Sequence, residues 1–168
     1  VRKKNLRGYK GGMKQRFGIA QALIGSPKLI IVDEPTAGLD PAERNRFHNL
    51  LSEIVEHIIV ILSTHIVDDV SDLCKNMAII NEGELIIQGQ PADLIKNIEG
   101  NIWEKVIEKD ELNEHLEKYN IISSRLFTGK IIIHAFSDSN PDGFHQISPS
   151  LEDVYFSSIK KVKLTANV

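Results

Sequence analysis

The sequence contains a single cysteine, Cys74, among its 168 residues, so no disulfide can form within the chain. Its apolar runs are short, such as the run 58–62, whereas a membrane-spanning helix needs about 20 residues. Positive charge is not in excess either, because 23 acidic residues outnumber 20 lysines and arginines and the net charge is −3. These absences exclude an intrachain disulfide framework, a membrane-spanning helix in this sequence, and the broad basic surface of a general nucleic-acid binder.

The remaining composition is that of a folded globular protein, with 42% apolar and 26% charged residues. A chain of this length accommodates one ordinary domain, or one domain with a small appendage. The sequence starts with Val1 rather than methionine and reaches motif-like residues at once. We therefore expect an N-terminally truncated fragment of a longer protein.

Two short apolar runs with helical segments around them indicate an α/β fold in the first part of the chain. Apolar residues recur at helical spacing over 12–24, and unbroken apolar runs follow at 29–32 and 58–62. Such runs are typical of strands that are buried on both faces of a parallel sheet. The alternation of strand and helix therefore predicts parallel buried strands with flanking helices.

Short sequence motifs predict the start of a helix and the turn of a hairpin. Asp40 is a candidate N-cap and Pro41 suits the first position of a helix. The tripeptide Asn-Glu-Gly at 81–83 predicts a hairpin turn. The alternation of predicted strands and helices changes near Gly100, and the residues after Gly100 predict a small α+β unit.

The second unit closes with a predicted helix whose start, Ser150 and Asp153, resembles a capping box. Four residues at helical spacing form the expected buried stripe of this helix: Leu151, Val154, Tyr155 and Ile159. Four aromatic residues are expected in the core of the unit rather than around a cofactor: Trp103, Phe127, Phe136 and Phe144.

Three candidate site residues follow the two predicted strands. Asp33 and Glu34 end the first strand, and His65 ends the second. Because ligands of open α/β sheets bind at the carboxyl ends of the strands, Asp33 suits a Mg²⁺ ion and Glu34 suits an attacking water. His65 suits a phosphate oxygen or a water. The plainer alternatives are an acidic pair that caps the next turn and a structural histidine.

The glycine pair Gly11-Gly12 stands at the start of the first predicted helix, in the stretch "YKGGMKQR". Backbone N–H groups and the positive end of the helix dipole form an anion site there without help from side chains. The stretch is not the phosphate-binding loop that ends in Gly-Lys-Ser or Gly-Lys-Thr, since Met13 precedes Lys14 and Gln15 follows it. A plain helix start with a glycine turn is the alternative.

In their order, these motifs resemble the nucleotide-binding subunit of ATP-binding cassette (ABC) transporters. "YKGGMKQRFGIAQAL" is similar to the family's signature motif and helix, "LIIVDEPTAGLDP" to its Walker B strand and D-loop, and "VILSTH" to the strand with its switch histidine. The ending "PSLEDVYFSSI" is similar to the C-terminal extension of subunits that serve exporters. The resemblance implies the C-terminal part of a P-loop-type ABC ATPase domain in residues 1–98 and a small α+β accessory domain in residues 99–168.

The resemblance also implies a role for each candidate site residue. Asp33 would belong to the Mg²⁺ shell, Glu34 would be the general base, and His65 would contact the γ-phosphate. Asp40 would belong to the D-loop, which is compatible with a capping role. ATP in this family lies between two subunits packed head to tail, so a nucleotide held chiefly by the second subunit would be contacted by the signature residues Lys10, Gly11, Gly12 and Met13. At the position of Lys10 the family normally has serine.

Finally, the resemblance implies ATP binding and hydrolysis that power the transport of a solute, with ATP and Mg²⁺ as cofactors. The expected partners are a second ATP-binding subunit, identical or different, and transmembrane permease subunits that hold the protein at the cytoplasmic face of the cell membrane. No nucleic acid is expected, and the C-terminal similarity favours an exporter. Because these residues include no P-loop and no glutamine loop, the chain alone is expected to be inactive. The alternative is a soluble ABC-type ATPase that acts on ribosomes or chromosomes.

Overall fold

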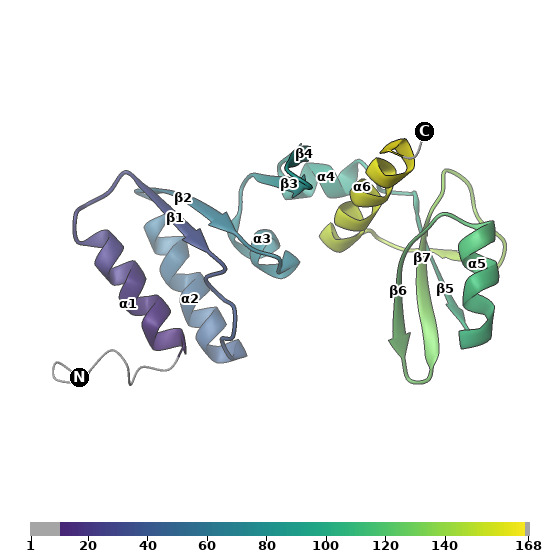
Figure 1. Cartoon of the computed structure of the whole chain (residues 1–168), viewed down its shortest axis with the longest axis horizontal. Helices are drawn as coiled ribbons and strands as arrows, with labels where there is room; N and C mark the ends of the chain where they lie inside the picture. Colours follow the sequence, from purple (N-terminus) through teal and green to yellow (C-terminus); the bar gives the residue numbers. More distant parts are fainter. Residues whose placement is uncertain (1–10, 167–168) are drawn as a thin grey trace. The chain divides into compact units, whose positions relative to one another are not determined.

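The structure of the chain, a computed structural model, describes residues 11–166. The chain divides into two compact units, of which the first ends at Cys74 and the second begins at Lys75 (Figure 1). Within the described residues, no helix has both the length and the apolar character needed to cross a membrane.

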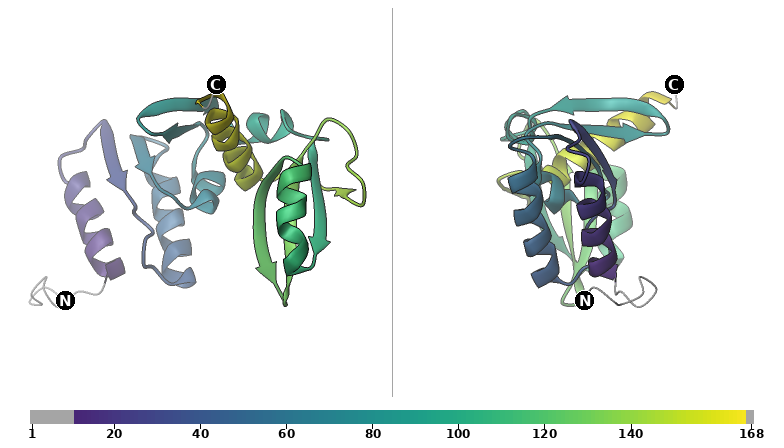
Figure 2. Two further views of the ribbon diagram at one scale, coloured as in Figure 1. Left: turned by 45° about the vertical axis from the view of Figure 1, so that its right-hand side comes forward. Right: turned by 90° about the vertical axis from the view of Figure 1, so that its left-hand side faces the viewer.

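The first unit is an α/β unit with the element order α1 (Gly11–Leu23), β1 (Leu29–Asp33), α2 (Pro41–Ile54), β2 (Ile59–Ser63) and α3 (Val67–Leu73). The strands β1 and β2 pair in parallel, with Leu29 opposite Ile59 and Asp33 opposite Ser63. Both long helices, α1 and α2, lie on the same side of this strand pair (Figure 2). The predicted parallel strands with flanking helices are therefore confirmed.

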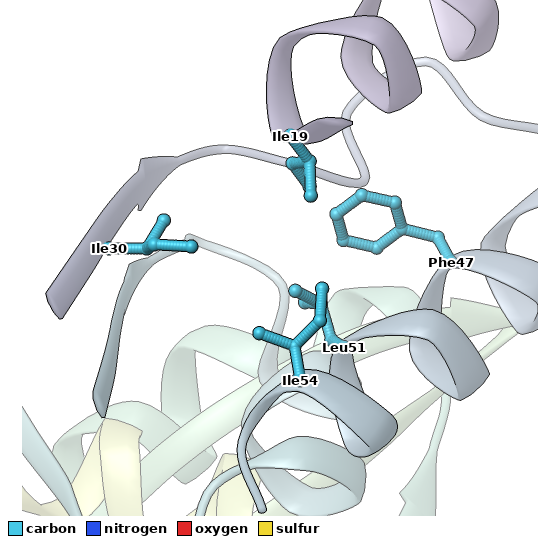
Figure 3. Packing of buried hydrophobic residues seen from close by; sticks show 5 residues of the cluster. All are labelled: Ile19, Ile30, Phe47, Leu51 and Ile54. Carbon is cyan, nitrogen blue, oxygen red and sulfur yellow. The ribbon is translucent and has the colours of Figure 1, made fainter. Parts of the chain in front are cut away.

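One face of the strand pair and the two long helices enclose the core of the first unit. Its five buried side chains converge in Figure 3: Ile19 from α1, Ile30 from β1, and Phe47, Leu51 and Ile54 from α2. The three α2 residues are spaced four and three apart, which places them on one stripe of the helix. Burial of this stripe against α1 and β1 fixes α2 beside the sheet.

The opposite face of β1 and β2 is open in the part of the chain that the structure describes. Ile31 is 69% exposed, and Ile59 and Ile61 are also exposed. Side chains alternate between the two faces along a strand, and α1 and α2 cover only the face that bears Ile30. The prediction that both strands are buried on both faces is therefore wrong for the described residues.

The helix α2 begins as the sequence predicts. Asp40 has extended backbone angles, and its Oδ1 accepts a hydrogen bond from the backbone N–H of Glu43 at 2.8 Å. Pro41 stands in the first turn, where a backbone N–H would have no helical partner in any case. Glu43 also forms an ion pair with Arg16 of α1, so the start of α2 is attached to α1.

The second unit begins with an antiparallel hairpin, β3 (Met77–Asn81) and β4 (Glu84–Gly89), followed by α4 (Pro91–Lys96). Glu82 and Gly83 both have positive φ angles, 51° and 83°. Two adjacent left-handed residues are typical of the tight turn that joins two antiparallel strands. The predicted hairpin is therefore confirmed.

A four-stranded antiparallel sheet, in the order β6-β7-β5-β8, forms the rest of the second unit. Its elements along the chain are β5 (Ile102–Ile107), a 3₁₀ helix (Lys109–Glu111), α5 (Leu112–Lys118), β6 (Ile121–Phe127), β7 (Lys130–Phe136), β8 (His145–Gln146) and α6 (Leu151–Ala166). This arrangement confirms the predicted α+β character. The sequence pattern does not predict β8, which has only two residues and so no periodicity to detect.

At the start of α6, Ser150 and Asp153 cap each other. The backbone N–H of Ser150 donates to Asp153 Oδ2 at 2.8 Å, and the backbone N–H of Asp153 donates to Ser150 Oγ at 3.3 Å. Of the predicted stripe, Val154 is buried but Tyr155 is exposed. Ser157 is buried instead. The buried side chains Leu151, Val154 and Ser157 follow one another at intervals of three residues along α6.

Among the four aromatic residues expected in the core of the second unit, Phe144 and Phe127 differ in burial. Phe144 is buried in a cluster with Ile107 and Ile133. Phe127 is exposed, because it is the last residue of β6 and precedes the turn to β7. The aromatic prediction is therefore right for Phe144 and wrong for Phe127.

The chain divides into its two units at a different residue from the domain boundary that the sequence predicts between residues 98 and 99. The packing division falls after Cys74, since α6 contacts both α4 and β4 and so joins them to the second unit. The assignment of residues 1–98 to one family domain and residues 99–168 to an accessory domain stays a prediction.

Candidate functional site

Parallel pairing brings the carboxyl ends of β1 and β2 together. Asp33 lies opposite Ser63, and the backbone N–H of Glu34 donates to the Ser63 carbonyl oxygen at 2.8 Å. His65 follows two residues after Ser63. Three of the candidate site residues, Asp33, Glu34 and His65, therefore lie at one place, which we call the β1–β2 edge.

Asp33 is exposed at the β1–β2 edge. Its Oδ1 accepts a hydrogen bond from Ser63 Oγ at 2.5 Å. A carboxylate beside a hydroxyl provides oxygen ligands of the kind that Mg²⁺ takes, together with several waters. Asp33 and Ser63 are therefore the residues of this edge that could hold a divalent cation.

Glu34 and His65 contact each other through one carboxylate oxygen. Glu34 Oε1 accepts a hydrogen bond from the backbone N–H of His65 at 3.1 Å and lies 2.7 Å from His65 Nδ1. Glu34 Oε2 is buried and has no hydrogen-bond partner among the described residues. A buried acceptor without a donor is unfavourable, so Oε2 suits a water or a substrate proton.

The backbone of Glu34 adopts a left-handed conformation, with φ of +46°. This region is unfavourable for residues other than glycine, by roughly 1–3 kcal/mol when it is held in place by surrounding structure. The strained residue turns the chain immediately after β1, and the backbone N–H of Ala37 then donates to the Glu34 carbonyl oxygen at 3.2 Å. Strain of this kind is common at active sites, which supports a functional role for the edge.

A buried carboxylate that the sequence pattern does not single out lies in the same unit. Asp69 of α3 is 0% exposed and interacts with Thr36, Arg44 and His48. Burial alone raises the pKa of Asp69, but the hydrogen bonds from these three side chains outweigh burial and lower the pKa below its usual 3.8. Asp69 is therefore a charged group in the interior of the first unit.

The predicted anion-binding residues lie in another part of the first unit. The helix α1 begins at Gly11, so Gly11, Gly12 and Met13 form its first turn, whereas Lys10 lies outside the described residues. Within residues 11–166, no hydrogen bond or ion pair joins this turn to the β1–β2 edge. The structure therefore does not combine the two groups of candidate residues into one site within this chain.

The segment after Glu34 runs between these two groups. Gln15 Nε2, near the start of α1, donates to the Ala37 carbonyl oxygen at 3.4 Å, and Asp40 then caps α2. The segment from Glu34 to Asp40 therefore leads from the β1–β2 edge past α1 to the start of α2.

Sequence comparison gives matches over nearly the whole chain. The family model described as "ABC transporter" matches residues 1–37. An ABC transporter ATP-binding protein of Bacillus subtilis is 33% identical over 93% of this chain and 58% of its own length. Another from Synechocystis is 33% identical over 99% of this chain and 50% of its own length. The chain thus spans about half the length of the curated relatives it matches.

Further matches cover about half of the chain. A Nod factor export ATP-binding protein of Neorhizobium galegae is 38% identical over 54% of this chain and 26% of its own length. A nucleotide-free ATP-binding cassette from an ABC transporter matches 54% of this chain and 36% of its own, with a TM-score of 0.50 and 27% identity. A second solved cassette of an ABC transporter matches 56% of this chain and 38% of its own, with a TM-score of 0.51 and 27% identity.

Proposed function

Because this chain belongs to the family of ABC transporter ATP-binding proteins, we propose that it forms part of an ATPase whose turnover drives the transport of a solute across a membrane. The contact between Glu34 and His65, beside Asp33 at one sheet edge, is the observation that supports the proposal most. Phosphoryl transfer depends mainly on positioning and charge stabilisation, so groups fixed around one phosphate suffice.

In the proposed site, Asp33 belongs to the Mg²⁺ shell and Ser63 orients its carboxylate. Mg²⁺ held there would supply charge neutralisation at the phosphate oxygens. Glu34 orients the attacking water and accepts its proton. Its free acceptor for this purpose is Oε2, since Oε1 already contacts His65.

His65 contacts the γ-phosphate in this proposal, and its ring is 76% exposed. When Nδ1–H donates to Glu34, a neutral imidazole carries only an acceptor at Nε2, and an acceptor does not bind a phosphate oxygen. The imidazolium form donates from both nitrogens. A contact between Nε2 and phosphate therefore needs a hydrogen on Nε2, which the imidazolium form provides while Nδ1–H stays on Glu34.

The proposed ATPase is a dimer with a second ATP-binding subunit, identical or different, packed head to tail. Gly11, Gly12 and Met13 present backbone N–H groups at the start of α1, and such a helix start binds anions. They would contact the nucleotide that the second subunit holds. Lys10 would add a long flexible cation where the family has serine, and Asp40 would stand in the D-loop between the two sites.

The proposed partners outside the ATPase are transmembrane permease subunits, which would hold the protein at the cytoplasmic face of the cell membrane. Export is the proposed direction. The name of the Neorhizobium galegae relative, a Nod factor export protein, supports it, as does the exporter-like C-terminal ending. The alternative, a soluble ATPase acting on ribosomes or chromosomes, has no support from the names of these relatives.

Hydrolysis of Mg-ATP by the complete gene product tests the proposed activity. Wild type should release phosphate, and Glu34→Gln should lower the rate by about 100-fold or more, because the amide cannot accept a proton. The 168-residue chain alone should show negligible turnover. Lack of turnover by the complete gene product, purified from membranes together with the subunits that co-purify with it, would contradict the proposal.

The unusual lysine of the signature motif is tested in the same assay. Lys10→Ser restores a short hydroxyl that can make a directional bond to phosphate, and we expect it to raise turnover and to favour dimer closure with ATP. Equal rates and equal dimerisation of the two proteins would remove any special role for Lys10.

A further inference from the structure

One carboxylate in the first unit binds three other segments of the chain at once. Asp69 Oδ1 accepts a hydrogen bond from Arg44 Nε at 2.9 Å and lies 2.9 Å from His48 Nε2, so it binds α2. Asp69 Oδ2 accepts hydrogen bonds from Thr36 Oγ1 and, at 3.4 Å, from Thr64 Oγ1. The same oxygen thus binds the loops that follow β1 and β2.

Both threonines stand next to the proposed catalytic residues. Thr36 is two residues after Glu34 and is buried. Thr64 immediately precedes His65, and its Oγ1 also accepts the backbone N–H of the residue after His65 at 3.0 Å. The backbone on both sides of His65 is thereby fixed. The placement of Glu34 against His65 therefore depends on two loops that share one oxygen of Asp69.

We propose that Asp69 is a positioning residue of the ATPase. It fixes the positions of Glu34 and His65 relative to each other and to α2. The inference rests on the proposed function. Asp69 is fully buried, so it acts through Thr36 and Thr64 rather than by touching nucleotide. A buried ion pair contributes little net stability, since the desolvation of its charges offsets their attraction, whereas it imposes a defined geometry on the groups that it joins.

A displacement of catalytic groups by a fraction of an ångström slows the chemical step more than it weakens substrate binding. Loss of the Asp69 contacts should therefore lower kcat for Mg-ATP hydrolysis and leave KM nearly unchanged. A residue that matters only for folding would instead change the melting temperature and the amount of active protein, without a selective effect on kcat per folded molecule.

Two substitutions at Thr36 in the complete gene product test the proposal. Thr36→Val keeps the shape but removes the hydroxyl, and kcat should fall about 10-fold to 100-fold with KM within about 3-fold of wild type. Thr36→Ser keeps the hydroxyl and should retain kcat within about 3-fold. The matched control is Asp68→Asn, next to Asp69 on α3, because Asp68 is 83% exposed and its nearest cation, Arg44 Nη2, is 3.9 Å away; it should behave as wild type.

Asp69→Asn tests the carboxylate itself. An amide has one acceptor oxygen, so it must leave either α2 or the two threonines without an acceptor, and the loss of kcat should be at least as large as in Thr36→Val. If Asp69→Asn does not fold, the two Thr36 variants and Thr64→Val, which removes the other hydroxyl, decide the question.

Several results would overturn the proposal. They are an unchanged kcat in Thr36→Val, an equal loss in Thr36→Val and Thr36→Ser, or a rise in KM with kcat unchanged. Absence of turnover in wild type would contradict the proposed function, whereas an active wild type with an equally active Thr36→Val would contradict only the role of Asp69.

Discussion

The backbone N–H and the imidazole Nδ1 of His65 both contact the same oxygen of Glu34, at 3.1 Å and 2.7 Å. The parallel register of β1 and β2 produces this contact, because it places the two residues at neighbouring strand ends. One oxygen of Glu34 therefore contacts His65 twice, whereas the other is buried and has no hydrogen-bond partner among the described residues. Because the two oxygens of Glu34 have different surroundings, substitutions at Glu34 and at His65 test separate contacts.

His65→Ala should separate function from stability. In the complete gene product we expect turnover to fall about 100-fold, as for the loss of one group that stabilises transition-state charge. The melting temperature should change little, since an exposed ion pair contributes about 1 kcal/mol or less. His57→Ala, at an exposed histidine of the same unit, is the control and should alter neither quantity. Full turnover in His65→Ala would contradict the proposed role.

Asp40 has a structural role that the structure shows and an interface role that we propose. Asp40→Ala should lower the free energy of unfolding of the first unit by about 1 kcal/mol, because the hydrogen bond to the Glu43 N–H is lost. Asp40→Asn keeps the cap and should keep the stability. Thermal unfolding measures both variants. If Asp40→Asn nevertheless reduces ATP-dependent dimerisation, the carboxylate also serves the interface; if it lowers the melting temperature as far as Asp40→Ala does, the capping explanation is wrong.

Adjacent isoleucines of β1 provide a matched pair for the core. Ile30 is 7% exposed and faces the helices, while Ile31 is 69% exposed on the other face. Ile30→Ala should lower the free energy of unfolding by about 2–5 kcal/mol. Ile31→Ala should change it by less than about 1 kcal/mol. Urea unfolding followed by circular dichroism measures the two values, and similar losses in both variants would show that the two faces are equally buried in solution.

The stability of the second unit should depend on pH through His134. His134 Nδ1 lies 2.7 Å from Asp153 Oδ1 on α6, and Nε2 lies 3.1 Å from Glu104 Oε2 on β5. His145 of β8 contacts the other oxygen of Glu104 at 3.2 Å. The hydrogen bond to Asp153 is the main cause that raises the pKa of His134 above 6.5, against the effect of burial. The protonated imidazole is therefore favoured in the folded unit.

Because the folded pKa of His134 is the higher one, its contribution to stability is complete below pH 6.5 and is lost as the pH rises through the raised pKa. The melting temperature of wild type should fall as the pH rises above 6.5 and through the raised pKa of His134. The melting temperature of His134→Gln should fall less over the same pH interval. Fluorescence of Trp103, the one tryptophan of the sequence, follows the second unit alone. His145→Gln, at the exposed histidine, serves as control. Parallel pH profiles of wild type and His134→Gln would contradict the prediction.

The sequence predicts the elements of the first unit well because their signals are local. The spacing of apolar residues defines α1, and the pair Asp40-Pro41 defines the start of α2. Strand exposure is different, since an apolar run such as 29–32 does not say how many faces have neighbours. The predicted burial of Phe127 is wrong for a related reason. Aromatic residues favour burial on average, but a residue beside a turn has few neighbours.

The placement of the candidate site is predictable for Asp33, Glu34 and His65, because strand ends in a parallel sheet meet at one edge. The buried position and contacts of Asp69 are not predictable in the same way. Its donors come from segments that are distant in sequence, at Thr36 and on α2, and no short pattern connects them. The available signal is a weak one: an acidic residue on the inward stripe of a helix of only seven residues.

The open face of β1 and β2 has a practical consequence for anyone who produces this chain by itself. Four exposed side chains gather on it as two facing pairs across the strands, Leu29 with Ile59 and Ile31 with Ile61. A flat apolar cluster of this kind promotes association between molecules, so recombinant preparations should form soluble oligomers or precipitate as the concentration rises. A lysine in place of Ile31 would put a charge at the centre of the cluster and should keep the chain monodisperse, while the buried side of the sheet stays as it is.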